Sequence, residues 1–162
     1  TAIHDLDLMI WYNGSKPLRV YAESIVKKCA HIGTEDAIVA TLKFDNGAIG
    51  CLETSWVLPM YTNPAPLDCS FNLIGTNGGA YVDGANNGLR ILNEESYIMP
   101  DLTHWPVLPA GLSGDLYNAM KDVVNSILND EAPYVSGREA LKCHVVVFAL
   151  KESMKINQPV YL

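Results

Sequence analysis

The stretch T-A-I-H-D-L-D-L-M-I-W-Y-N-G, residues 1–14, organises the rest of the chain. Apolar residues would occupy most of its circumference, so the pattern predicts a buried helix of about three turns. Gly14 suits the position just past the helix end, and Pro17 follows where a helix cannot continue. His4 falls in the first turn, where an imidazole is either a hydrogen-bonded core residue or a site residue; the residues alone favour the core.

The chain begins at Thr1 rather than at a methionine, and nothing ahead of the helix resembles a signal peptide. A buried helix is an unusual first element for a free N-terminus. We therefore expect residues 1–162 to form one domain that is a fragment of a longer chain.

The composition excludes several classes of function. The net charge of −7 leaves no basic stripe to neutralise phosphates, which argues against nucleic-acid binding. No apolar run reaches the roughly 18 residues of a membrane span. Four widely spaced cysteines without a C-x-x-C pair predict buried thiols in a reducing cytoplasm, with no disulfide framework and no metal site.

The middle of the chain predicts a run of antiparallel strands. Residues 18–28 alternate like a strand, and residues 37–44 and 48–57 flank Asp45-Asn46-Gly47, a hairpin signal typical of a type I′ turn. After a proline-marked loop, further strands are expected at residues 67–74, 80–83 and 89–92. Together they would form a meander of at least five strands.

Helices follow the strands. Residues 93–113 are irregular and contain His104-Trp105, while Ser113 can cap a helix that runs to residue 129. Ser136-Gly137-Arg138-Glu139 is a capping box for a last helix to about residue 155, and residues 158–162 can add an edge strand. The pattern predicts an α+β fold, an open and mostly antiparallel sheet with helices packed on one face. The second face is half apolar, which predicts that a subunit, a domain or a ligand covers it.

The candidate sites each have a structural alternative. Gly75-x-x-Gly78-Gly79 precedes a strand rather than a helix, so a hairpin turn is favoured over a phosphate loop. Asp5 and Asp7 would point in different directions on a helix, and structural roles are favoured for both. Trp56 is equally well explained as core or as a platform for a sugar ring, and His104 is an exposed residue that could bind a ligand.

The opening resembles the start of the C-terminal domain of the Gfo/Idh/MocA oxidoreductases, relatives of glucose–fructose oxidoreductase and inositol dehydrogenase. The family signature there is D-x-x-x-H-x-x-D; His4 and Asp7 match its histidine and second aspartate, and the first aspartate would fall one residue before Thr1. The resemblance continues in order to the end of the chain. It is carried by F-D-N-G-A-I-G-C-L-E-T-S-W (44–56), I-G-T-N-G-G-A-Y-V-D (74–83) and V-S-G-R-E-A-L-K (135–142).

The resemblance implies a two-domain parent whose N-terminal Rossmann domain binds NAD or NADP and supplies a lysine. This chain would provide substrate-binding and oligomerisation surfaces for an oxidoreductase that acts on a sugar or polyol hydroxyl. His4 would be the catalytic proton relay, and Thr1, Trp56 and His104 would contact substrate. The fragment alone would bind no dinucleotide and be inactive; the alternative is a non-catalytic dimerisation or regulatory ligand-binding module.

Overall fold

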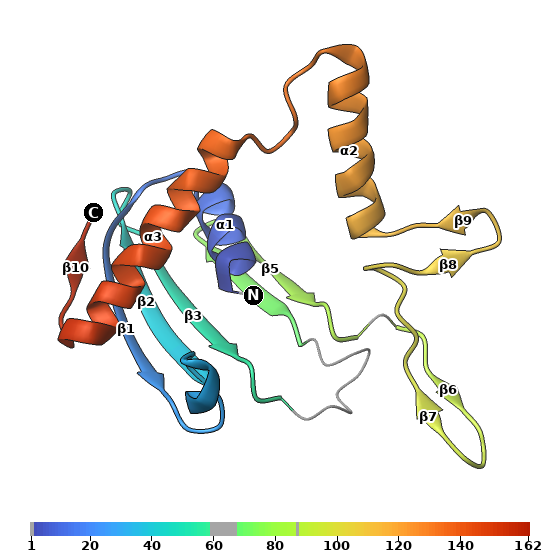
Figure 1. Ribbon diagram of the computed structural model, residues 1–162, viewed down its shortest axis with the longest axis horizontal. Helices are drawn as coiled ribbons and strands as arrows, with labels where there is room; N and C mark the ends of the chain where they lie inside the picture. The colour runs from blue at the N-terminus through green and yellow to red at the C-terminus, as the bar shows by residue number, and fades with distance from the viewer. Residues whose placement is uncertain (1, 59–67, 87) are drawn as a thin grey trace. The chain divides into compact units, whose positions relative to one another are not determined.

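The computed structural model describes residues 2–58, 68–86 and 88–162, which divide into two compact units. The first unit comprises residues 1–57 and 135–162, and the second comprises residues 58–134. Each unit is described by itself. Their helices and antiparallel strands confirm the predicted α+β class (Figure 1).

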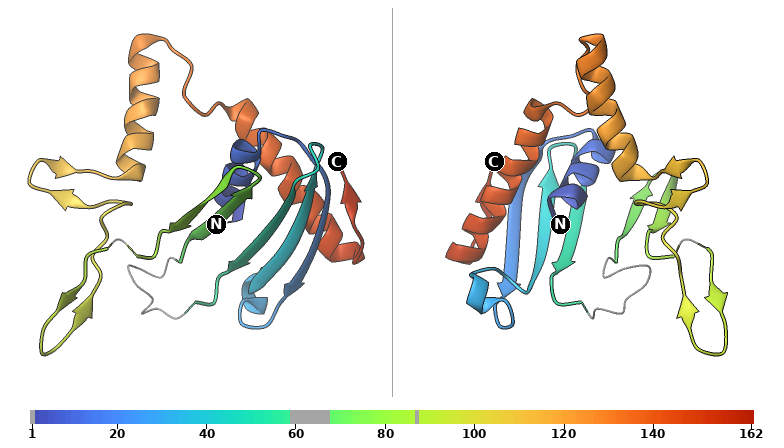
Figure 2. Two further views of the ribbon diagram at one scale, coloured as in Figure 1. Left: turned by 180° about the vertical axis from the view of Figure 1, so that it is seen from behind. Right: turned by 45° about the vertical axis from the view of Figure 1, so that its right-hand side comes forward.

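The first unit is built on a four-stranded antiparallel sheet with the strand order β10-β1-β2-β3. Helices α1 and α3 pack together on one face of it, α3 over β1 and α1 over β3 (Figure 1). The opposite face of β1, β2 and β3 is seen from behind in Figure 2, left. The elements are α1 (Ala2–Asn13), β1 (Pro17–Ile25), the 3-10 turn η1 (Ala30–Ile32), β2 (Ala37–Phe44), β3 (Ile49–Ser55), α3 (Gly137–Ile156) and β10 (Val160–Tyr161).

Period-two alternation explains which strand residues form the core, because successive side chains of a strand point to opposite faces. On β2 the buried residues are Ala40, Leu42 and Phe44, and on β1 they are Val20 and Ala22. Helices α1 and α3 cover this side of the sheet and complete the core. The cluster consists of Leu6, Val20, Ala22, Ala40, Leu42, Phe44, Leu52, Val146, Ala149 and Leu150.

The first helix is less buried than its sequence predicts. Gly14 ends it with φ +61°, and its N–H donates to the carbonyl of Ile10 at 3.0 Å, as expected for a left-handed C-terminal glycine. Of the described residues of α1, Leu6 is the buried one, whereas Trp11 is 60% exposed. The helix lies on the edge of the layer, over β3, so the sheet and α3 cover only part of its circumference.

The β2–β3 hairpin is confirmed, but its turn is not the predicted type I′ turn. The N–H of Phe44 donates to the carbonyl of Ala48 at 3.0 Å, and Gly47, with φ +92°, donates to the carbonyl of Phe44 at 3.1 Å. Asn46 has no positive φ, so this is a three-residue loop with glycine in the left-handed position. The Asn46 side chain is held by Asn13 at 2.6 Å, which ties the hairpin to the end of α1.

The fourth strand of the sheet comes from the C-terminus. The predicted edge strand is confirmed as β10, which pairs with β1 through Val20 and Val160. Beyond that pair, the buried hydroxyl of Ser153 lies between β1 and the segment that leads into β10. It accepts from the backbone N–H of Ala22 at 3.1 Å and donates to the carbonyl of Gln158 at 2.7 Å. Ser153 therefore continues the ladder where β1 and the approach to β10 do not bond directly.

Ser153→Ala is expected to lower the free energy of unfolding by about 1–3 kcal/mol, because it leaves the buried N–H of Ala22 without an acceptor and removes the partner of the Gln158 carbonyl. Chemical denaturation measures the change. Ser24→Ala, at an exposed serine of β1, is the control and should stay within about 0.5 kcal/mol of the parent. Equal stability of the two variants would show that Ala22 and Gln158 bond directly once the hydroxyl is gone.

The second unit contains short hairpins and one long helix. The predicted turn at Gly75-x-x-Gly78 is confirmed, with Gly75 paired to Gly78. The predicted five-strand meander is wrong in its pairing, because the remaining strands pair in twos and β10 completes the larger sheet. The elements are β4 (Ser70–Gly75), β5 (Gly78–Asp83), β6 (Ile91–Leu92), β7 (Tyr97–Ile98), β8 (Val107–Leu108), β9 (Gly111–Leu112) and α2 (Asp115–Asn129).

The two later helices differ in how they begin. Ser136 caps α3 as predicted, accepting from the N–H of Glu139 at 3.2 Å. The residue that precedes α2 is Gly114 rather than the predicted Ser113, with φ +98°. A Cβ at position 114 would lie 2.6 Å from the carbonyl oxygen of Thr103, so only glycine allows the preceding loop to pack this closely. Among the described residues, no helix is long and apolar enough to cross a membrane.

Candidate functional site

The first turn of α1 presents the predicted catalytic residue at the surface. His4 is exposed, so it is not the hydrogen-bonded core residue that the residues alone favoured. Its neighbour Asp5 is partly buried, and that burial raises the pKa of the Asp5 carboxyl, while the nearby charge of His4 acts in the opposite direction. An exposed imidazole beside a carboxyl can accept a proton from a bound hydroxyl and return it.

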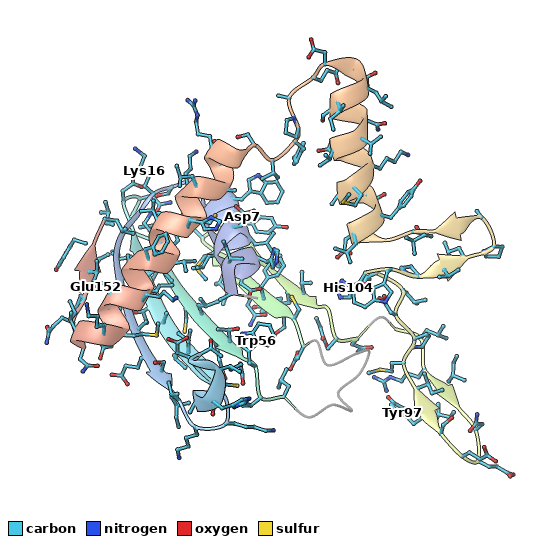
Figure 3. The ribbon with its side chains drawn as sticks, in the orientation of Figure 1. Asp7, Lys16, Trp56, Tyr97, His104 and Glu152 are labelled. Atoms are coloured by element: carbon cyan, nitrogen blue, oxygen red, sulfur yellow. The ribbon has the colours of Figure 1, made fainter. Side chains whose placement is uncertain are left out.

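Asp7, three residues further along, has a structural partner. The Cys143 thiol of α3 donates to Asp7 Oδ1 at 3.1 Å, a contact between α1 and α3. Asp7 is labelled on α1 in Figure 3. Burial raises the pKa of Cys143 to about 12, and the hydrogen bond to Asp7 adds to the effect, so this thiol is unreactive. The expected structural role is thus met, but by a thiol rather than by the backbone or basic group that the sequence predicts.

The other cysteines are less buried than expected. Cys51 is exposed and Cys29 and Cys69 are half-buried, which leaves Cys143 as the buried thiol. Alternation places Cys51 on the face of the sheet away from the helices, which the core does not cover. No group of three or more metal-binding side chains occurs among the described residues.

A cavity of about 260 Å³ opens beside the first turn of α1. We call it the Trp56 cavity, because Trp56, at the end of β3, forms one of its walls. The Trp56 residue is 66% exposed, and its backbone N–H donates to the backbone carbonyl of Asp36 at 2.9 Å. The lining residues come from α1, the start of β2, the end of β3 and α3: Ala2, Ile3, Thr34, Glu35, Asp36, Ala37, Ile38, Thr54, Trp56, His144 and Val147.

Asp36 fixes the loop that borders this cavity. Its carboxylate accepts from the N–H groups of Cys29 at 2.6 Å, Lys28 at 2.7 Å and Lys27 at 3.2 Å. The bond from Cys29 is the main cause of the lowered pKa of Asp36, and the other two backbone bonds act in the same direction. The Asp36 carboxylate therefore stays ionised, and its hydrogen bonds to three backbone N–H groups hold the loop in place.

The structure brings together only part of the predicted site. Trp56 lines the same cavity as Ala2 and Ile3 of the first turn of α1, whereas His4 is not among its lining residues and Thr1 lies outside the described residues. His144 also lines the cavity, and sequence reasoning missed it. Its only signal was a histidine within the last helix, whose position over β1 and against α1 the sequence does not reveal.

His104 lies in the second unit, where a carboxylate orients it. Its Nδ1 lies 2.9 Å from Asp115 Oδ2, at the start of α2, and its ring stacks at a tilt beside Trp105. Asp101 holds the preceding loop, accepting from the backbone N–H groups of Thr103, His104 and Trp105, each at 2.9 Å. The loop thus presents an imidazole in a defined orientation.

Asp101 should titrate well below an ordinary carboxyl. Its partial burial would raise the pKa, but the three backbone N–H groups together lower it from 3.8 to about 2. Because the folded-state pKa is the lower one, the stabilisation is complete above pH 3.8 and is lost as the pH falls through about 2. In NMR titrations the amide proton shifts of His104 and Trp105 should change with a midpoint near pH 2, and this transition should be absent in Asp101→Asn. A midpoint near 3.8 would contradict the effect of the three backbone hydrogen bonds on Asp101.

The chain is similar in sequence and in fold to known oxidoreductases. It is 25% identical to the uncharacterized oxidoreductase YrbE of Bacillus subtilis (strain 168), in a match that covers 98% of this chain and 46% of that protein. The structure of myo-inositol 2-dehydrogenase from Lactobacillus plantarum matches with a TM-score of 0.74 and 21% identity, over 99% of this chain and 46% of the other.

A second inositol enzyme shows the same fold. Scyllo-inositol dehydrogenase from Lactobacillus casei, solved with NAD(H) and scyllo-inositol, matches with a TM-score of 0.69 and 20% identity, over 98% of this chain and 46% of the other. The chain thus spans about half the length of the proteins it matches. The GFO/IDH/MocA C-terminal domain model matches residues 1–81, half of the chain. The chain therefore belongs to the GFO/IDH/MocA family and corresponds to its C-terminal domain.

Proposed function

We propose that this chain is the substrate-binding and oligomerisation domain of an NAD(P)-dependent oxidoreductase that acts on a sugar or polyol hydroxyl. The observation that carries the proposal is the exposed His4 in the first turn of α1, the turn whose Ala2 and Ile3 line the Trp56 cavity, in a chain of this family. In this role His4 accepts the proton of the substrate hydroxyl while a hydride leaves the same carbon. Thr1, Trp56 and His104 are proposed as substrate contacts.

The hydride acceptor would be held elsewhere. The sequence contains no G-x-G-x-x-G turn, and its Gly75-x-x-Gly78-Gly79 segment is a hairpin whose second strand is β5, so no helix N-terminus is there to receive a pyrophosphate. The Gly75–Gly79 hairpin therefore does not fit the pyrophosphate of a dinucleotide. We propose that a separate Rossmann domain of a longer protein binds NAD or NADP, in keeping with the 46% of its relative's length that this chain covers.

The test of this function is oxidation of polyols by the full-length protein. With NAD or NADP and myo-inositol, scyllo-inositol or glucose, at least one pair should give reduced nicotinamide, followed by absorbance. Dinucleotide binding measured in parallel separates the alternatives. Binding without reduction by any polyol would favour a non-catalytic module and contradict the proposed activity.

The open face of the sheet supports the oligomerisation role. Val39 is 53% exposed and Ile49 is 76% exposed, and both point away from the helices. Charged residues lie on the same face, because Val39 stands between its cross-strand neighbours Glu23 on β1 and Glu53 on β3. Such a mixed surface suits contact with a second copy of the chain. Sedimentation of the full-length protein and of Ile49→Lys tests it: the substitution should shift an oligomer toward monomer.

A further inference from the structure

The Trp56 cavity contains an imidazole whose protonation pattern is set by the helix that carries it. His144 Nδ1 lies 2.9 Å from the carbonyl oxygen of Ala140, one turn earlier in α3. A carbonyl oxygen has no proton to give, so Nδ1 must carry the hydrogen of this bond. In the neutral imidazole the second nitrogen, Nε2, is then a hydrogen-bond acceptor. His144 can therefore accept a hydrogen bond from a hydroxyl group in the cavity.

The rest of the lining combines an aromatic wall with apolar side chains. The indole of Trp56 offers a large flat surface, and Ala37, Ile38 and Val147 add apolar contacts. The C–H groups on one face of a sugar or cyclitol ring suit such a surface, while its hydroxyl groups need polar partners at the edge. A volume of about 260 Å³ lies just below the usual range of ligand pockets, so the cavity has room for a single ring at most.

The charge of the lining discriminates against anions. Its ionisable residues are Glu35, Asp36 and His144, and neither lysine nor arginine is among the lining residues that the structure describes. Asp36 is ionised and is occupied by three backbone N–H groups. A phosphate or carboxylate placed here would meet two acidic residues without a permanent cation, at a cost that grows as water is excluded.

We propose that the Trp56 cavity binds an uncharged hydroxylated ring, with one ring face on Trp56 and a ring hydroxyl that donates to His144 Nε2. The inference rests on the proposed function, which already takes a sugar or polyol as substrate, and deepens it by assigning a second histidine to the site and by excluding anionic rings. His144 is a binding and specificity residue in this scheme. The proton transfer remains with His4.

The experiment compares ligand binding by full-length variants in the absence of turnover. Calorimetry with myo-inositol should give a Kd that rises about 3- to 10-fold in His144→Leu, the value of one neutral hydrogen bond. His144→Gln keeps an acceptor and should recover part of the loss. His31→Leu is the matched control, since His31 is also exposed and its Nδ1 lies 3.0 Å from the carbonyl of Lys28, but it does not line the cavity.

Two further measurements complete the test. Nitrogen-15 NMR of the imidazoles should show the Nδ1–H form of His144 and a shift of Nε2 when myo-inositol is added. Myo-inositol 1-phosphate should bind more weakly than myo-inositol. An unchanged Kd in His144→Leu, or equal binding of the phosphate, overturns this inference even if polyol oxidation is observed. Absence of oxidation with the Kd differences intact would instead contradict the proposed reaction and support the cavity.

Discussion

His4→Ala in the full-length protein is expected to lower kcat for polyol oxidation by about 10²- to 10⁴-fold, the usual contribution of a general acid–base. The imidazole lies at the surface of the first turn of α1, where no core packing depends on it. The loss should therefore fall on the chemical step rather than on folding. Steady-state kinetics with the best polyol, together with circular dichroism, separates these effects.

A matched variant controls for removal of an exposed imidazole as such. His31→Ala changes a surface histidine of η1 and should leave kcat and KM close to the parent values. The two histidine roles also have different kinetic signatures. His4→Ala should act mainly on kcat, whereas loss of the His144 contact should act mainly on substrate binding. Full activity of His4→Ala would remove this residue from the mechanism.

Leu6→Ala is expected to lower the free energy of unfolding by about 2–5 kcal/mol. Leu6 has no exposed surface and packs in the cluster formed by the sheet and α3. It is the buried residue among those described in α1, so the helix that carries His4 depends on it for much of its apolar anchoring. Thermal and chemical denaturation measure the loss, and a cavity in the core is its cause.

The control lies on the same helix. Trp11 is 60% exposed, and Trp11→Ala should change stability by no more than about 1 kcal/mol although it removes a larger side chain. A loss of activity in Leu6→Ala at temperatures where the protein remains folded would show that α1 must be held firmly for His4 to act. Equal effects of Leu6→Ala and Trp11→Ala on stability would contradict the packing described for α1.

Local sequence signals predicted strands β1 to β5, the end of α1 at Gly14 and the Ser136 cap, but missed β7, β8 and β9 and placed the cap of α2 at Ser113 instead of Gly114. The alternation in β2 predicts its buried residues, because a side-chain period of two follows from strand geometry alone. Ser136 caps α3 because a short hydroxyl side chain reaches the N–H of the residue three positions on. Asn46 is the counterexample: it has no positive φ, so the turn is not the predicted type I′ turn, and its side chain donates to Asn13 at the end of α1.

The sequence by itself determined the α+β class and the β2–β3 hairpin, since both follow from local patterns of apolar and turn residues. Only the tertiary structure decided which residues meet across long separations. Cys143 bonds to Asp7, 136 positions away, and His144 faces the cavity that Trp56 borders. Such pairs follow from how α1 and α3 pack on the sheet, and hydrophobic packing is non-directional, so no local pattern encodes which side chains it brings together.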